Sequence, residues 1–350
     1  AGLVGIDDLV LMVSGDVQVN KGPAGGDRLD WSVATTSGDP DNKLPDLAMD
    51  HNVELAIHNG EAALNVFGFV VLSVSEFELV KRTGVSIDDG AAGPVAAFTA
   101  DVLSVSLTAS GFVGVGGKLS DPVNATSAVE TADAVGFNVP SGSLDLVIVQ
   151  DTTTKTNKYT GLQTSVTNAG LVGIDDLELT VTGDVQVNRG PAGGDRLDWS
   201  SVTGVGNELP DATLAMGHDV ELEVSGSAAL NVFGFVVLTV PSFELVKRTD
   251  VAIDDGGTGP VAAFTADVLA VQMTAGGFVG VGGSLSAAND STATVVTTDA
   301  VGFSVPSGSL LDQVILQDTV TAANKYTGLQ ASVTNAGLVG IDDLELTVTG

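Results

Sequence analysis

The chain repeats itself, and this repetition restricts its fold more than any other feature of the sequence. The stretch Ala1 to Leu9 returns at 169–177 and again at 336–344, at intervals of 168 and 167 residues. A period this long holds several strands or helices, so each copy is expected to be a large structural unit rather than one coil of a solenoid. The predicted boundaries are 1–168 for the first copy, 169–335 for the second and 336–350 for the start of a third.

Apolar and polar residues alternate along much of each copy. In the second copy, Leu177 to Thr182 and Val220 to Val224 both follow a period of two, which is typical of a β-strand with one buried face. The run Val232 to Leu238 is apolar throughout and is predicted to be a strand buried on both faces. Helices are not expected, because helical spacing of apolar residues is not sustained and 44 Gly oppose it. The prediction is an all-β fold with at least half of its residues in strands.

Two all-β architectures suit a repeat of this length. The favoured one is an elongated β-solenoid or a rod of stacked β-layers, in which each copy contacts chiefly its sequence neighbours. The alternative is a pair of tandem antiparallel β-sandwiches, joined like beads. The sequence favours the rod, because no Pro-rich or Ser-rich linker separates the copies and residues 169–177 run directly into the next predicted strand.

The charge of the chain excludes several classes of partner. The 44 acidic residues outnumber 13 Lys and Arg, which gives a net charge of -31. Such a field repels nucleic acid and anionic lipid, whereas it attracts cations. The longest apolar run, Ala62 to Leu72, is far shorter than the roughly 20 residues of a membrane helix, so membrane insertion is not expected. The absence of Cys removes disulfides and thiolate metal sites.

Adjacent Asp pairs recur beside Gly-rich stretches and are the candidate metal ligands. Carboxylate oxygens are the ligands that Ca²⁺ prefers, so calcium is the expected cation. The alternative is that these side chains form turns by accepting hydrogen bonds from their own backbone, since adjacent strand residues point to opposite faces. The candidate residues are Asp7, Asp8, Asp88, Asp89, Asp175, Asp176, Asp254 and Asp255.

No catalytic or cofactor-binding residue is assigned, and the chain is predicted not to be an enzyme. Two near-identical copies would have to carry two active sites, and neither copy supplies paired acid and base groups with support from His or a metal.

Three phrases, Gly170 to Gly183, Val185 to Asn188 and Ala229 to Phe235, combine alternating strands with Gly and Asp turns. In these phrases and in its acidic, Cys-free composition, the chain resembles the tandem-repeat regions of giant bacterial surface and secreted proteins, such as adhesins and RTX-associated exoproteins. The resemblance implies an extracellular or cell-surface location and an elongated β structure used in attachment, sheaths or fibres. It assigns no site residues.

The expected function is that of a structural repeat protein, which forms a fibre, sheath or surface layer by head-to-tail self-association. The copies of the repeated stretch at 1–9 and 336–344 need the same cover that 169–177 receives inside the chain, so another copy is the expected partner. The alternative is an adhesin stalk or glycan-binding module, with surface glycans as partners and the variable loop Ser37 to Lys43 as the contact.

Overall fold

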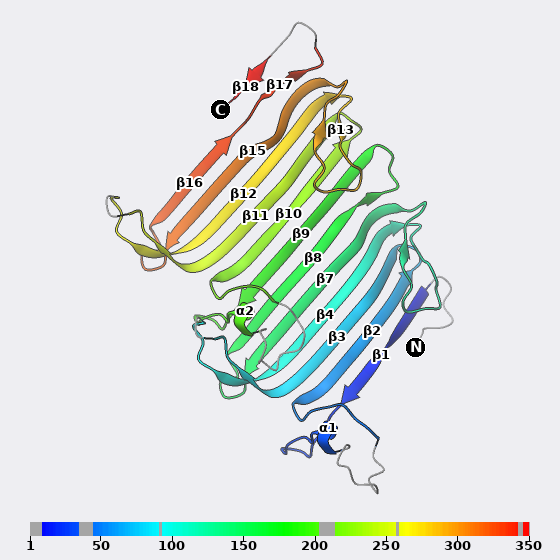
Figure 1. The fold of residues 1–350 in the computed structure, drawn as a ribbon, viewed down its shortest axis with the longest axis vertical. Helices are drawn as coiled ribbons and strands as arrows, with labels where there is room; N and C mark the ends of the chain where they lie inside the picture. The colour runs from blue at the N-terminus through cyan, green and yellow to red at the C-terminus, as the bar shows by residue number, and fades with distance from the viewer. Residues whose placement is uncertain are drawn as a thin grey trace.

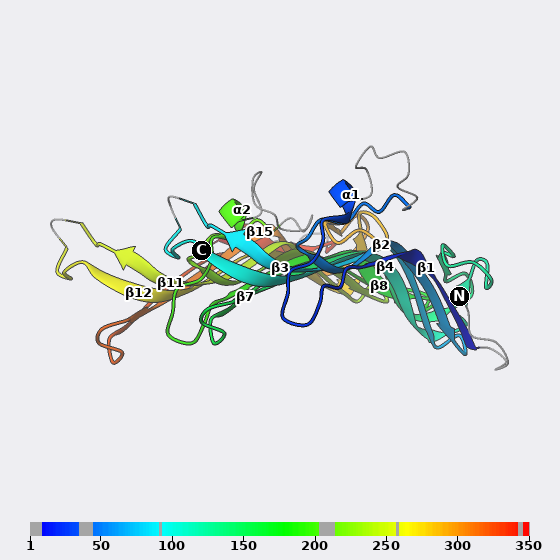
Figure 2. The same ribbon diagram turned by 90° about the horizontal axis from the view of Figure 1, so that it is seen from below.

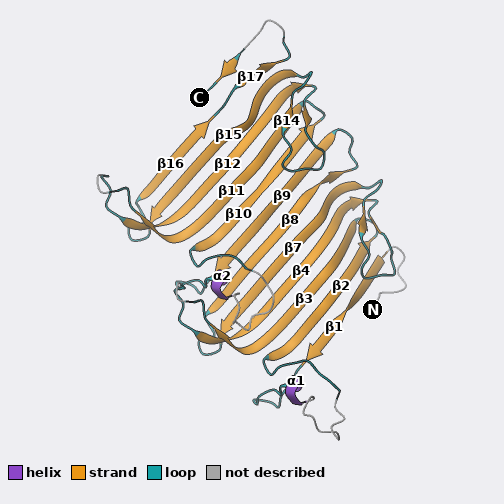
Figure 3. Cartoon of the chain, in the orientation of Figure 1, coloured by secondary structure: helices purple, strands orange, loops and turns teal. Residues whose placement is uncertain are grey.

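The computed structural model describes residues 9–34, 45–90, 93–202, 214–256, 259–341 and 346–349. Strands make up 62% of the chain and helices 3%, so the predicted all-β, elongated fold is confirmed (Figure 3). The two short helices, α1 (Trp31–Ala34) and α2 (Trp199–Val202), lie in equivalent loops of the two copies.

One antiparallel sheet of 14 strands forms the body of the molecule (Figure 1). Its order follows the chain, so each long strand pairs with the next one along the sequence. The strands are β1 (Leu9–Val19), β2 (Val53–Val66), β3 (Val70–Ile87), β4 (Phe98–Val115), β7 (Val135–Asp151), β8 (Lys158–Val172), β9 (Leu177–Arg189), β10 (Val220–Val232), β11 (Val236–Ile253), β12 (Phe264–Val281), β15 (Val301–Asp318), β16 (Lys325–Ser332), β17 (Ala336–Val339) and β18 (Thr347–Val348).

The sheet continues without interruption from the first copy into the second. Strand β8 pairs with β9 from Thr160 opposite Arg189 to Gly170 opposite Thr180. The copies are therefore joined edge to edge rather than as separate sandwiches. Because each strand is antiparallel to the one before it, the described chain follows a meander and not the coils of a solenoid.

The apolar run from Val232 to Leu238 is not the single strand that the sequence predicted. Strand β10 ends at Val232 and β11 begins at Val236, so a tight turn interrupts the run. Phe233 has a φ of 52° and Gly234 a φ of 67°, and the Asn231 side chain accepts a hydrogen bond of 2.9 Å from the Gly234 N–H. A glycine in the left-handed region and an Asn that bonds its own backbone are strong turn formers, and here they override the apolar pattern.

The two faces of the sheet differ, and β4 shows how. Its even-numbered residues from Ala100 to Phe112 lie on the face that carries the loops, which we call the covered face. Its odd-numbered residues from Leu103 to Val115 lie on the opposite face, which we call the open face. Figure 2 shows the sheet edge-on as a single layer, with α1 and α2 on the same side.

Two kinds of segment pack on the covered face. The hairpin of β5 (Lys118–Leu119) and β6 (Val129–Glu130) covers the Phe112 ring in the first copy. The hairpin of β13 (Ser284–Leu285) and β14 (Val295–Val296) covers Phe278 in the second. The segment that contains α2 covers the other end of the first copy's strands and forms the largest core cluster.

Candidate functional site

The most extensive packing in the molecule is at the junction between the two copies. The loop that joins β9 to β10 belongs to the second copy, but it folds back over the first copy's strands (Figure 1). We call its described part, residues 190–202 and 214–219, the seated loop. It contributes Leu197, Trp199, Val202, Leu214 and Met216 to a buried cluster. Their partners from the first copy are Val85, Ile87, Ala100, Val102, Val147, Val149 and Tyr159.

One buried side chain, Asn188 at the end of β9, sets the shape of the seated loop. Its Nδ2 donates hydrogen bonds of 2.9 Å to the Leu197 carbonyl and 3.0 Å to the Gly217 carbonyl. Its Oδ1 accepts a hydrogen bond of 2.9 Å from Trp199 Nε1. Asn188 thus provides hydrogen-bond partners for both segments of the loop and for the only polar atom of the indole ring. This allows Trp199 to be fully buried.

The first copy contains the same loop with the same hydrogen bonds, and we call its described part, residues 22–34 and 45–52, the exposed loop. Asn20 donates bonds of 2.8 and 3.0 Å to the carbonyls of Leu29 and Asp50, and it accepts one of 3.0 Å from Trp31 Nε1. The burial nevertheless differs: Leu29 is 57% exposed, whereas its equivalent Leu197 is 0% exposed.

The surface that receives the seated loop also exists twice. In the first copy it is buried, with Val147 at 0% and Tyr159 at 5% exposure. The equivalent residues of the second copy, Val314 and Tyr326, are 38% and 37% exposed. We call the second-copy surface, formed by Val251, Ile253, Val268, Val314, Leu316 and Tyr326, the receiving surface. It is apolar, preformed and uncovered within the described chain.

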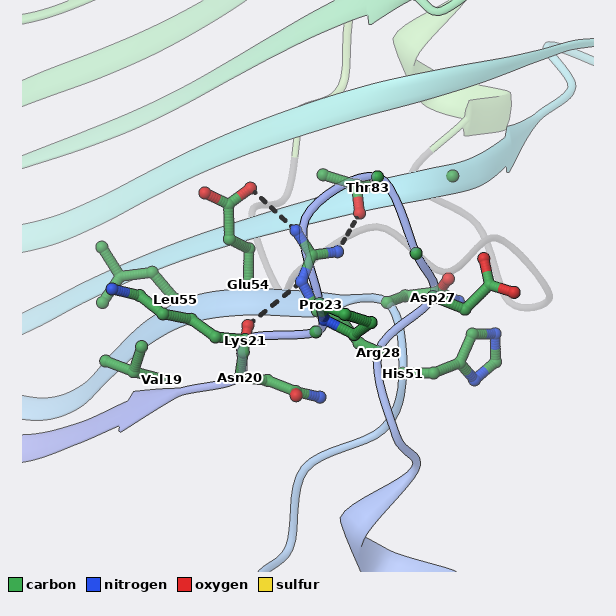
Figure 4. Close-up of a pocket in the computed structure, with 15 residues that line it drawn as sticks. Val19, Asn20, Lys21, Pro23, Asp27, Arg28, His51, Glu54, Leu55 and Thr83 are labelled. Atoms are coloured by element: carbon green, nitrogen blue, oxygen red, sulfur yellow. Dashed lines mark hydrogen bonds and ion pairs between the residues drawn. The ribbon is translucent and has the colours of Figure 1, made fainter.

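An Arg holds each loop against its own copy and lines a hollow beside it. Arg28 Nη2 lies 3.2 Å from Glu54 Oε2, Nε donates a 3.1 Å bond to the Asn20 carbonyl, and Nη1 donates to Thr83 Oγ1 (Figure 4). Lys81 binds the other oxygen of Glu54 at 2.8 Å. The second copy repeats the arrangement around Arg196, and the two hollows measure about 840 and 830 Å³. Because these charged groups are paired, they fix the loop to the sheet.

The predicted metal ligands are placed at separate turns. Asp7 and Asp8 lie outside the described residues. Asp88 and Asp254 each accept a 2.9 Å hydrogen bond from the backbone two residues ahead, as turn-forming Asp residues do. Asp89 and Asp255 accept bonds of 3.1 and 3.0 Å from the N–H groups of Val95 and Val261.

The remaining pair, Asp175 and Asp176, lies in the turn between β8 and β9, at the opposite end of the strands from Asp88. Asp176 has a φ of 58°, and its carbonyl accepts a 2.8 Å bond from Phe233 N–H. In the part of the chain that the structure describes, no three His, Asp or Glu side chains gather closely enough to hold a metal ion. One side-chain oxygen of each of Asp88, Asp89, Asp254 and Asp255 accepts a hydrogen bond from a backbone N–H, and calcium binding stays a prediction.

Asp89 has a second property that sequence reasoning did not find, because it lies inside the junction. It is 1% exposed, and its Oδ1 has no hydrogen-bond partner. Burial raises the pKa of the Asp89 carboxyl, and the neighbouring Asp198 carboxylate of the seated loop raises it further. Burial also raises the pKa of Tyr159, with Asp151, Asp195 and Asp89 adding to the effect. Its equivalent in the second copy, Asp255, is exposed.

Two further residues of the junction were missed from the sequence. Asn188 and Gly161 carry no chemical motif, and only their exact repetition as Asn20 and Gly328 could have drawn attention to them. Gly161 is needed because a Cβ there would clash with Leu214 and come within 2.7 Å of Trp199 Cε2.

Comparison with known proteins finds no matching family model, no matching curated relative and no matching solved structure. Among the described helices, none has the length and apolar character needed to cross a bilayer.

Proposed function

We propose that this chain is a non-catalytic structural protein whose sheet is lengthened head to tail by successive copies of the repeat. The observation that carries the proposal is the seated loop. Inside the chain, one copy places its loop on the preceding copy and buries Leu197 and Trp199 completely. The same chain presents an uncovered loop at one end and an uncovered receiving surface at the other.

The strand edges support the same geometry. At the internal junction Thr160 lies opposite Arg189 and Leu162 opposite Val187. The equivalent contact between two chains would place Thr327 of β16 opposite Lys21, just beyond β1. Within the described residues, β16 pairs with β15 alone, so its second edge is open to a strand. The start of the third copy shows the same register beside β17, because β18 pairs Ala336 with Val348 as Ala169 pairs with Val181. In the contact between two chains, β1 of the incoming chain takes this place and β18 leaves it.

Such an association is heterologous, because the loop of one chain contacts the receiving surface of the next. Heterologous contacts that do not close into a ring build open filaments. An extracellular fibre, sheath or surface layer is the role we propose for this assembly.

Two variants that each block one half of the contact test the proposal. Leu29→Asp places a charge on the exposed loop and leaves the receiving surface intact. Gly328 is the second-copy equivalent of Gly161, so the indole of an incoming loop would lie against it. Gly328→Val therefore blocks the receiving surface, and in the isolated chain a Cβ on Gly328 meets nothing within 4 Å. Val123→Asp, at a site that is 76% exposed on the β5–β6 hairpin, is the matched control.

Sedimentation velocity over a concentration series gives the readout. The unmodified chain and Val123→Asp are expected to grow in mass with concentration, whereas neither blocking variant should grow by this contact. Mixing the two variants should restore association that neither shows alone, since each retains the half that the other lacks. Growth of both single variants into assemblies larger than a dimer, or a mixture that stays as small as its components, contradicts the proposal.

A further inference from the structure

The open face of the sheet is apolar across both copies, and nothing in the described chain covers it. Cross-strand partners lie on the same face, so the pairing register identifies its rows of side chains. One row crosses eight strands, from β1 to β10, through Val17, Ile57, Leu79, Val105, Leu146, Leu162, Val187 and Leu222. None of these side chains is buried, although all are Val, Ile or Leu.

Further rows run parallel to the first. Nearer the β2–β3 and β10–β11 turns, one row in each copy consists of large apolar side chains. They are Val66, Val70, Val113, Phe137 and Leu171 in the first copy and Val232, Val236, Val279, Phe303 and Leu338 in the second. Val113 and Val279 are each more than half exposed. At the N-terminal end an apolar hollow lined by Val13, Ile57 and Phe77 opens onto the same face.

The charged residues lie away from these rows. Glu78 pairs across the strands with Ser106, and Ser106 with Asp145, which places both acids on the covered face. Lys81 and Lys247 lie on the open face, and their ammonium groups turn to Glu54 and Glu221 at 2.8 and 2.6 Å. The register also places five other charged residues on this face, all near the end of the strands that carries the seated loop: Asp101, Lys158, Arg189, Asp267 and Lys325. The open face is therefore apolar from the middle of the strands to the end with the β2–β3 and β10–β11 turns.

The exposed surface area of the chain is unusually large for its mass. A compact monomer of 35.1 kDa exposes about 13,000 Å². This chain exposes 18798 Å², because one layer of sheet leaves both faces accessible. Monomeric proteins rarely expose apolar patches larger than a few hundred Å², and larger ones mark interaction sites.

We infer that the open face packs against the open face of a second copy of this chain, to form a two-layered sheet with a dry apolar interior. This surface is different from the head-to-tail contact, and the inference does not depend on it. The chemistry is self-complementary, since Val, Leu and Phe rows meet equivalent rows and the acidic covered faces point outward to water. Sheets stacked in this way lie about 10 Å apart and interdigitate their side chains.

The available area is ample for such a pair. The strands from β2 to β12 are 13 to 18 residues long, apart from the short hairpin strands. At about 3.3 Å per residue and 4.8 Å between strands, they offer on the order of 2,000 Å² per chain. Stable interfaces bury about 800 Å² per partner.

The aromatic residues favour a second copy over a lipid surface. Trp and Tyr gather where proteins meet the membrane–water interface. All four of them in this chain, Trp31, Trp199, Tyr159 and Tyr326, belong to the covered face and its loops. The net charge of -31 also opposes approach to an anionic membrane.

The experiment uses the full chain with Gly328→Val, so that head-to-tail growth is blocked. Light scattering should give twice the mass of 35.1 kDa. Leu107→Lys with Met273→Lys places a cation at the centre of the open face in each copy and should give a monomer. The matched control, Thr108→Lys with Gln272→Lys, changes the neighbouring residues on the covered face and should leave the dimer intact. Far-ultraviolet circular dichroism checks that each variant is folded.

Small-angle X-ray scattering of the Gly328→Val chain provides a measurement that needs no open-face variant, because two layers about 10 Å apart differ in cross-section from one. A monomer, a single-layer cross-section, or equal dissociation by both Lys pairs overturns the inference. So does a chain that stays monomeric and floats with neutral phosphatidylcholine vesicles, since lipid would then be the occupant of the open face.

Discussion

The seated loop and the exposed loop have almost the same sequence, yet only one of them has a hydrophobic core. Both are shaped by an Asn, both hold a Trp by its Nε1, and both are tied to the sheet by an Arg. The difference is that a preceding copy lies beneath the seated loop. Local hydrogen bonds therefore determine the conformation of the loop, whereas burial depends on distant residues of the preceding copy.

This separation shows how the repeat works as a building unit. A loop that already has its bound shape loses little conformational entropy when it docks, and preorganisation of this kind strengthens association. The receiving surface is equally preformed, since the Phe264 and Tyr326 rings lie 5.2 Å apart in the second copy, much as Phe98 and Tyr159 lie 5.4 Å apart in the first.

The largest expected difference between the two loops is at the Trp. Trp199→Ala removes a fully buried indole and should cost about 3–5 kcal/mol. Trp31→Ala changes the exposed loop, where no residue of α1 is buried. It should therefore cost only about 1 kcal/mol. Urea unfolding followed by far-ultraviolet circular dichroism measures both under conditions where the chain does not associate. Equal losses of stability would show that docking contributes nothing to the seated loop.

A smaller difference is expected for the glycine beneath each Trp. Gly161→Ala forces a methyl group against Leu214 and Trp199, and overpacking of this kind costs about 1–3 kcal/mol. Gly328→Ala meets nothing within 4 Å, and it should leave the stability unchanged or raise it by about 0.5 kcal/mol, because Gly is unfavourable in a strand. Hydrogen exchange at the seated loop identifies where stability is lost. If Gly161→Ala proves neutral, the close packing at the junction is wrong.

Much of the fold could be predicted from the sequence, because strands are encoded locally. The alternation at Leu177 to Thr182 and Val220 to Val224 corresponds to β9 and β10. The turn at Phe233 and Gly234 was missed, since an apolar run gives no period and the turn is set by Asn231 and a left-handed glycine.

The junction could not be predicted, because it depends on packing between distant segments. Nothing in the sequence near Trp199 indicates that Val147 and Tyr159 lie beneath it. The Asp pairs illustrate the opposite problem: their composition suggested a ligand site, while those that the structure describes form backbone turns or, at Asp89, become buried against a neighbouring copy.

The smallest expected difference is a pH dependence confined to the seated junction. The folded pKa of Asp89 is raised, by burial first and then by Asp198, so the carboxyl holds its proton more tightly in the folded chain than in the unfolded one. The sign follows from linkage: stability falls as the pH rises from the ordinary Asp pKa of 3.8 through the raised folded value, because a buried carboxylate must then ionise. Above that window the cost is fully present, and below 3.8 it is absent.

Asp89→Asn removes this cost while it keeps an oxygen to accept the Val95 N–H. The variant should therefore be more stable than the parent at pH 7 and nearly equal to it near pH 3. Asp255→Asn changes the net charge by the same amount at the exposed equivalent position, so the difference between the two variants isolates the junction from the general relief of acidic repulsion. Thermal midpoints at pH 3 and pH 7 measure it. A gain at pH 7 that is identical in both variants would mean that Asp89 ionises as freely as a surface carboxylate, and that the seated loop does not enclose it.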